Sequence, residues 1–199
     1  MAQHQARAGS LVGIGRDLAA VFLRPSSATF RRVTAGATWA QVGLLVGLTG
    51  LLTGLLRLAG SGLTGLEPLP AVIGGVMITL FLFSVLTLLL LYIADRFRGQ
   101  GDTVDHVYAV ALIWTPFTVL AGLPAIGDLV WLVGACLGLP ALLYGTYLTY
   151  CAMQGVHGLD EGAARFVALT PAILVILLML IGVGVTFLLT TNTLVVPEG

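Results

Sequence analysis

The chain has 199 residues, of which 58% are hydrophobic and only 9% are charged, and its formal net charge at pH 7 is zero. A soluble domain carries about 25% charged residues, because a globule in water must cover its surface with polar groups. This composition excludes an ordinary soluble domain, and the zero net charge excludes a broad basic surface for nucleic acid. The sequence therefore predicts an all-α integral membrane protein that has the lipid bilayer as its partner and does not bind nucleic acid.

The N-terminal segment, residues 1–36, is predicted to be cytoplasmic and to contain a short amphipathic helix. Its apolar residues recur at helical spacing: Leu11, Ile14, Leu18 and Phe22. Pro25 should end this helix, because proline lacks the backbone N–H that a helix interior needs. The helix either lies on the cytoplasmic leaflet or packs beneath the transmembrane bundle, and the sequence supports both arrangements equally.

Five apolar segments are long enough to cross about 30 Å of hydrocarbon, which takes about 20 helical residues. Their predicted ranges are 39–59, 71–93, 107–123, 129–152 and 166–190. Together they predict one helical transmembrane domain over residues 37–190, followed by a short external tail over 191–199. The connecting loops are brief, which leaves no room for a second folded domain between the spans.

The arginines predict the orientation, because positive residues are retained in short cytoplasmic loops. If the chain crosses five times with its N-terminus inside and its C-terminus outside, eight of the nine arginines are cytoplasmic. These eight are Arg7, Arg16, Arg24, Arg31, Arg32, Arg96, Arg98 and Arg165. The exception, Arg57, lies near the outer end of the first span, where its long side chain can reach the headgroups.

A glycine face is predicted on the first span. Its members are Gly43, Gly47, Gly50 and Gly54. Their intervals of four, three and four place them on one side of a helix, where small residues let another backbone approach closely. The face is interpreted as a helix-packing surface, either for a second protein chain or for a neighbouring helix of the same chain.

Three prolines fall inside the third, fourth and fifth spans, at Pro116, Pro140 and Pro171. A proline within a helix frees a backbone carbonyl and bends the helix, so these positions are candidate kinks. Interrupted helices can form transport sites near the middle of the bilayer, but bent helices are also common as simple architecture.

A polar cluster is predicted at the cytoplasmic loops. Its candidate members are Asp95, Asp102, Asp105, His106, His157 and Asp160. If the two loops converge, these groups could bind a divalent cation or support acid–base chemistry. Their spacing matches no known ligand pattern, and acidic residues in loops usually face water. We therefore predict no metal, no cofactor and no catalytic residue.

Several stretches carry a family resemblance. They are Pro25-Ser-Ser-Ala-Thr-Phe30, the Asp95–Asp102 stretch with Gly99 and Gly101, Tyr108-Ala-Val-Ala-Leu-Ile-Trp-Thr-Pro116, Tyr144–Tyr150, and Val156-His-Gly-Leu159. On these residues, over about residues 20–190, the chain resembles the Yip1 domain family, particularly its small bacterial members. The resemblance implies a five-helix bundle with a cytoplasmic N-terminus in a bacterial inner membrane.

Eukaryotic members of that family associate with one another and with Rab GTPases, and they have a long cytosolic N-terminal region that contains an Asp-Leu-Tyr-Gly-Pro element. This element does not occur in the sequence, so Rab binding is not carried over. The expected function is that of a non-enzymatic, multi-pass membrane protein that associates with itself or with another membrane protein. The alternatives are a transporter or channel component, suggested by the prolines, and a membrane-surface enzyme that uses the Asp and His loops.

Overall fold

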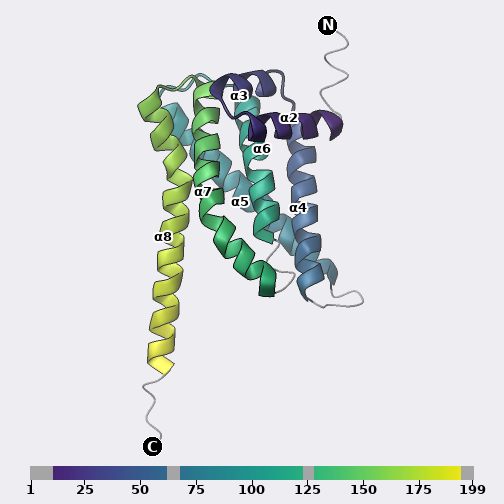
Figure 1. Ribbon diagram of the computed structural model, residues 1–199, viewed down its shortest axis with the longest axis vertical. Coiled ribbons are helices and arrows are strands. Elements are labelled where there is room, and N and C mark those ends of the chain that lie inside the picture. The colour runs from purple at the N-terminus through teal and green to yellow at the C-terminus, as the bar shows by residue number, and fades with distance from the viewer. Residues whose placement is uncertain (1–10, 62–67, 123–127, 194–199) are drawn as a thin grey trace, which may run out of the picture.

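The computed structural model describes residues 11–61, 68–122 and 128–193, and within these ranges the protein is all-α, with seven helices and no strand. The helices are α2 (Leu11–Leu23), α3 (Ser27–Thr34), α4 (Trp39–Ser61), α5 (Pro68–Arg96), α6 (Thr103–Gly122), α7 (Asp128–His157) and α8 (Glu161–Thr193). Figure 1 shows α4 to α8 running alongside one another, with α2 and α3 lying across one end. The predicted all-α class is confirmed.

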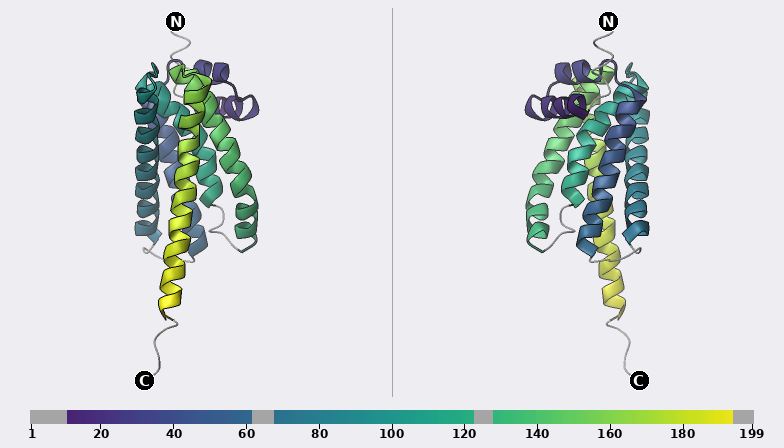
Figure 2. Two further views of the ribbon diagram at one scale, coloured as in Figure 1. Left: turned by 90° about the vertical axis from the view of Figure 1, so that its left-hand side faces the viewer. Right: turned by 90° about the vertical axis from the view of Figure 1, so that its right-hand side faces the viewer.

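We call this end of the bundle the polar end, and it comprises α2, α3, residues 97–102 between α5 and α6, and residues 158–160 between α7 and α8. Helix α4 packs against α5 and α6, and α7 packs against α6, α8 and α3. At the opposite end, α8 extends past the other helices (Figure 2). The bundle therefore has one end where all elements meet and another where a single helix continues alone.

Three helices are long and apolar enough to cross a membrane, over Trp39–Leu56, Val72–Arg96 and Thr103–Leu120 of the described residues. Helices α7 and α8 have 30 and 33 residues, which also exceeds the about 20 that a crossing needs. Parts of these two helices lie outside the residues whose side chains are described, so five crossings and the orientation of the termini stay predictions.

The helices extend beyond the predicted spans because polar residues cap them outside the apolar stretch. Helix α6 begins at Thr103 rather than at 107, since Asp102 Oδ1 accepts a hydrogen bond from the Val104 N–H at 3.0 Å. Helix α8 begins at Glu161 rather than at 166, since Asp160 Oδ2 accepts from the Gly162 N–H at 3.1 Å. Capping carboxylates satisfy backbone donors that a helix leaves free at its first turn.

Helix α3 was not predicted from the sequence. Helix α2 ends at Leu23, ahead of Pro25, and Ser26 then starts α3 by accepting a hydrogen bond on its Oγ from the Thr29 N–H at 3.1 Å. Serine is a favoured residue at this position, because its short side chain reaches the free N–H groups of the first turn. The segment before the first span is therefore a pair of short helices rather than one.

Helix α2 is packed on the bundle and also exposes apolar residues. Tyr108 on α6 donates a hydrogen bond to Asp17 Oδ2 at 2.9 Å, and Tyr144 on α7 donates to the Phe22 carbonyl at 2.6 Å. Ile14 and Val21 are buried, whereas Leu11, Val12 and Leu23 are exposed. One face of α2 is therefore packed against the bundle, as in the second predicted arrangement, and its position on the cytoplasmic leaflet stays a prediction.

Candidate functional site

The structure brings together two of the six residues predicted for the polar cluster. His106, in the first turns of α6, and His157, the last residue of α7, meet with Nδ1 of His106 2.8 Å from Nε2 of His157. Their rings are edge to face, with centroids 4.9 Å apart. His106 is 0% exposed and His157 is 3% exposed, so the pair lies in the core although the sequence placed both residues at loops.

The hydrogen bonds around the pair assign the protons on both rings. His106 Nε2 lies 3.2 Å from the Thr87 carbonyl of α5. A carbonyl can only accept, so His106 Nε2 carries a proton and its Nδ1 accepts from the Nε2–H of His157. His157 Nδ1 is then a free lone pair, and this buried atom has no hydrogen-bond partner among the described residues.

Residues 97–102 cover this free nitrogen. A Cβ built on Gly99 or on Gly101 would lie only 2.9 Å or 2.8 Å from His157 Nδ1, so the loop backbone rests directly against the ring. The Gln100 N–H donates to the His157 carbonyl at 3.2 Å. Only glycine leaves room for this approach, because any side chain at these positions would displace the ring or the loop.

The loop is set in place by the C-terminus of α5. The Gly99 N–H bonds to the Ala94 carbonyl and the Arg98 N–H to the Asp95 carbonyl, each at 3.0 Å, which is the pattern of a Schellman motif. Arg98 has a φ of 60°, in the left-handed region that glycine usually occupies at this position. The turn directs the chain from α5 back across the end of α7.

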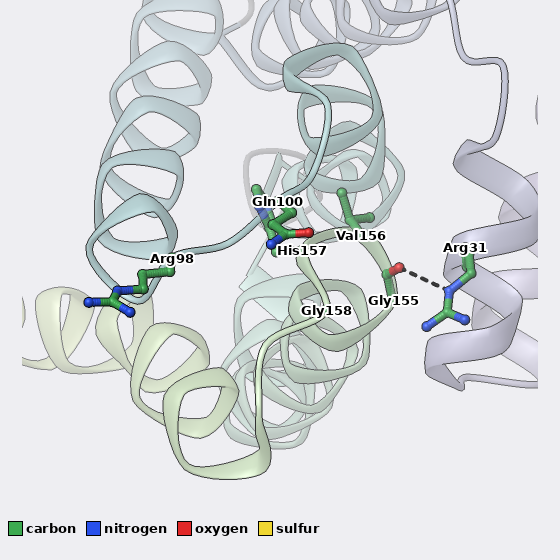
Figure 3. Close-up of a pocket in the computed structure, with 7 residues that line it drawn as sticks. All are labelled: Arg31, Arg98, Gln100, Gly155, Val156, His157 and Gly158. Atoms are coloured by element: carbon green, nitrogen blue, oxygen red, sulfur yellow. Dashed lines mark hydrogen bonds between the residues drawn. The ribbon is translucent and has the colours of Figure 1, made fainter.

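A shallow hollow of about 350 Å³ lies beside the pair at the polar end. It is lined by Arg31, Arg98, Gln100, Gly155, Val156, His157 and Gly158. Figure 3 shows Arg31 and Arg98 on opposite sides, with Arg98 pointing away from the other residues and the Arg31 Nε donating to the Gly155 carbonyl at 3.5 Å. The arginines thus border the hollow, and Arg31 also stabilises the C-terminal end of α7.

In the described part of the chain, none of the other four predicted members of the cluster is hydrogen-bonded to the pair through its side chain. Asp102 and Asp160 are the capping residues described above, Asp105 is half-buried, and Asp95 is exposed at the end of α5. Within the described part of the chain, no group of three or more His, Cys, Asp or Glu residues is arranged to hold a metal ion.

Burial shifts the acid–base properties of His157 and Asp17 at this end. Burial lowers the pKa of His157, which lies beyond the predicted span 129–152, while the nearby Asp95 carboxylate acts in the opposite direction. Burial raises the pKa of Asp17 on α2, and the hydrogen bond from Tyr108 acts against that rise. Burial therefore favours the neutral form of His157, in agreement with the proton assignment.

The predicted glycine face divides into two parts. A Cβ on Gly54 would lie 3.0 Å from the Val72 carbonyl, and one on Gly50 would lie 3.4 Å from the Val76 side chain, so these two glycines pack against α5. Gly43 and Gly47 are exposed, and no atom lies within 4 Å of a Cβ built on either. The four glycines thus share a helix face but not a neighbour.

Pro116, Pro140 and Pro171 lie inside α6, α7 and α8, as expected from their positions within the apolar segments. Helix α7 is visibly bent in Figure 1, as expected for a helix that contains a proline. None of the three prolines lines the hollow at the polar end. Their prediction as parts of a transport site stays untested.

Comparison with known families gives one result. The model of the Yip1 domain matches residues 19–183, which is most of the chain. No curated protein and no solved structure matches. The match includes all of the segments on which the resemblance was based, and it runs from α2 into α8. The apolar helices of the protein agree with the predicted membrane location. The chain belongs to the Yip1 domain family of membrane proteins.

Proposed function

We propose that this Yip1 domain protein is a non-enzymatic membrane protein that acts by helix association through Gly43 and Gly47 of α4. The partner is a second copy of the chain or another membrane protein. In this proposal the chain crosses the inner membrane of a bacterium five times, with its N-terminus in the cytoplasm and its C-terminus outside.

The observation that carries this proposal is the open half of the glycine face. Gly50 and Gly54 allow a neighbouring helix to pack closely against this face. Helix α5 approaches α4 there until the Val72 carbonyl is almost in contact with it. Gly43 and Gly47 continue the same face with open space beside them. In lipid, helices associate mainly by close packing at small residues, because lipid tails are as apolar as leucine.

The position of the arginines supports the proposed orientation. The arginines with described side chains all lie at the polar end, on α2 and α3, at the end of α5, in the loop after it, or in the first turns of α8. They are Arg16, Arg24, Arg31, Arg32, Arg96, Arg98 and Arg165. Because positive charge is retained on the cytoplasmic side, the polar end is the cytoplasmic end in this proposal.

The alternatives receive less support. A transporter would be favoured by a polar hollow beside the prolines, and the hollow described above lies instead at the polar end. An enzyme would be favoured by an accessible base, but the free nitrogen of His157 is buried under the loop. Neither histidine has a nucleophile as its hydrogen-bond partner, since His106 bonds only His157 and a carbonyl.

Association is tested by replacing Gly47 with leucine and measuring the mass of the detergent-solubilised protein by light scattering, together with energy transfer between labelled copies in liposomes. We expect Gly47→Leu to weaken self-association by at least about tenfold, which is about 1.4 kcal/mol. Gly138→Leu on α7 is the matched control, because Gly138 is also exposed with open space beside it.

An unchanged assembly in Gly47→Leu would contradict the proposal. If the wild-type chain is a monomer, the second arm of the experiment is co-purification of crosslinked partners from native membranes, which Gly47→Leu should lose and Gly138→Leu should retain. A protein that is monomeric and has no partner sensitive to Gly47 would also contradict it. For the topology, a reporter fused to the C-terminus should be external, and a cytoplasmic reporter would overturn five crossings.

A further inference from the structure

The strongest unexplained feature of the fold is the free ring nitrogen of His157. Both histidines are buried, and three of their four ring nitrogens form hydrogen bonds, two between the rings and one to the Thr87 carbonyl. The fourth, His157 Nδ1, is buried without a hydrogen-bond partner among the described residues. A buried polar atom without a partner is disfavoured, so its retention here calls for a role.

We infer that His157 Nδ1 is a proton-binding site that acts as a latch, and that protonation there releases residues 97–102 from the end of α7. The inference concerns the polar end and is independent of the glycine face of α4. The proton comes from the aqueous phase at this end, and the change is one of loop position, with no covalent step.

The geometry explains why the neutral and protonated rings require different loop positions. In the neutral pair, Nδ1 needs no acceptor, and the backbone at Gly99 and Gly101 can lie directly against it. A proton on Nδ1 adds a donor at the contact with the loop, and it gives the buried pair a positive charge. An unpaired buried charge is strongly disfavoured, so the protonated form is stabilised when the loop moves and admits water.

Release is a local event because few bonds hold the loop. In the described part of the chain, one backbone hydrogen bond joins this loop to α7, and it runs from the Gln100 N–H to the His157 carbonyl. The bonds that form the Schellman motif belong to the end of α5 and can persist when Gln100 moves away. Movement of Gln100 would widen the hollow that it lines together with Arg31 and Arg98.

The charged groups around the pair differ in sign. Asp95, at the end of α5, favours the protonated form of His157, whereas Arg31 on α3 and Arg98 in the loop border the hollow that His157 also lines. The other charged groups at this end are held elsewhere or exposed. Asp102 and Asp160 cap α6 and α8, Glu161 pairs with Arg165, Arg96 donates to Tyr92, Asp17 accepts from Tyr108, Asp105 is half-buried, and Arg16, Arg24 and Arg32 are exposed.

The experiment measures hydrogen–deuterium exchange of residues 97–102 in the full chain, reconstituted in lipid nanodiscs. Two conditions are compared, about pH 7.5 and about pH 5, on either side of the ordinary histidine pKa of about 6.5. After correction for the chemical exchange rate, the protection of the Gln100 amide should fall by at least about tenfold in acid, which corresponds to one pKa unit of linkage. Equal protection at both pH values would overturn the inference.

Two variants separate the latch from a general effect of acid. His157→Gln keeps an N–H that can donate to His106 Nδ1 but cannot titrate, so its loop should stay protected at both pH values. Asp95→Asn removes the favourable carboxylate, so loop release should need a lower pH than in the wild type. Release of the loop in His157→Gln with the wild-type pH dependence would overturn the inference.

If His157→Gln does not fold, nitrogen NMR of the wild-type imidazoles provides an independent test. At neutral pH both rings should carry their proton on Nε2, and on acidification the Nδ1 signal of His157 should become protonated together with loop release. A neutral His157 ring with its proton on Nδ1 would overturn the inference, because that nitrogen would then have no lone pair to accept a proton.

Discussion

The polar end and the rest of the bundle are built in different ways. At the polar end, side chains form hydrogen bonds between different elements, as Tyr144 does with α2, Arg31 with α7, and His106 with α5. Along the helices, most hydroxyl groups bond to their own helix instead, as Thr53 and Ser84 do with the carbonyls four residues earlier. Thr49 on α4 does both, since its hydroxyl donates to the Leu45 carbonyl at 2.7 Å and its oxygen also lies 2.9 Å from the Thr115 hydroxyl of α6.

This difference follows from the solvent at each place. A bilayer offers no hydrogen-bond partners, so a helix inside it must satisfy its own polar groups, and large apolar side chains can face outward. On α5 and α8 the exposed residues include Ile73, Met77, Phe81, Leu88, Leu177 and Leu180. At the polar end, loops and short helices must be satisfied by specific contacts. We therefore expect substitutions at the polar end to have the largest effects on stability.

Gly155 should be the most sensitive position at the polar end. It lies in the last turn of α7, where a Cβ would press against the Ser27 carbonyl and come within 3.0 Å of the Phe30 Cβ. Backbone cannot yield as a flexible side chain can, so Gly155→Val should destabilise the fold by about 3 kcal/mol, through displacement of α3. Thermal unfolding in detergent measures this effect.

Gly138→Val is the control for Gly155, since it adds the same side chain to the same helix at an exposed position with open space. It should change the free energy of unfolding by less than about 0.5 kcal/mol. Equal losses in the two variants would mean that valine weakens α7 itself. The proposed contrast between the polar end and the lipid-facing surface would then be wrong.

The contact of α2 with the bundle should be next in magnitude. Tyr108→Phe removes the hydrogen bond to Asp17 Oδ2 and should cost about 1–2 kcal/mol at neutral pH. This bond lowers the pKa of Asp17 against the rise that burial causes, so it favours the ionised carboxylate. The stabilisation is therefore present above the pKa of Asp17 and is lost as the pH falls through it.

Denaturation of Tyr108→Phe and wild type at several pH values tests this coupling. The difference between them should shrink as the pH falls through the pKa of Asp17, which burial places above the ordinary aspartate value of about 4. Tyr147→Phe on α7 is the control, because Tyr147 is exposed and should show little effect at any pH. A loss in Tyr108→Phe that stays constant with pH would exclude the ionised Asp17 as its cause.

The helices and the position of the glycine face could be predicted from sequence because both depend on local patterns. Hydropathy gave the long helices, and spacing placed Gly43 to Gly54 on one side of α4. The sequence also contains local signals for helix starts, since Ser26, Asp102 and Asp160 each stand one residue before a helix, as capping residues do. Recognising them would have predicted α3 and identified the two aspartates as caps.

The contacts of the candidate site could not be predicted in the same way. His106 and His157 are 51 residues apart, and their contact depends on how α6 and α7 pack. The role of Gly99 as a cover for the His157 ring depends on the turn that ends α5. That turn places Arg98, rather than a glycine, in the left-handed conformation, and nothing in the local sequence signals it.

Within the lipid-facing part of the bundle, the two halves of the glycine face should respond differently to alanine. Gly54→Ala should destabilise by about 1 kcal/mol or more, because the new methyl group would meet the Val72 carbonyl at 3.0 Å. Gly47→Ala should be neutral or stabilising by up to about 1 kcal/mol, since alanine is the better helix former and meets nothing. Equal effects in a detergent unfolding assay would mean that both halves pack against protein.

The smallest effect on stability is expected for the Glu161–Arg165 ion pair in the first turns of α8. It is the one ion pair found among the described residues. Both side chains are more than 60% exposed, and exposed pairs four residues apart contribute about 0.3–0.5 kcal/mol. Glu161→Gln should therefore lower the free energy of unfolding by about 0.5 kcal/mol or less. In 1 M salt the Debye length is about 3 Å, so most of this difference between variant and wild type should disappear. A loss above about 1 kcal/mol that persists in salt would mean that the pair is shielded from water in the membrane. The start of α8 would then belong with the packed contacts of the polar end rather than with its solvated edge.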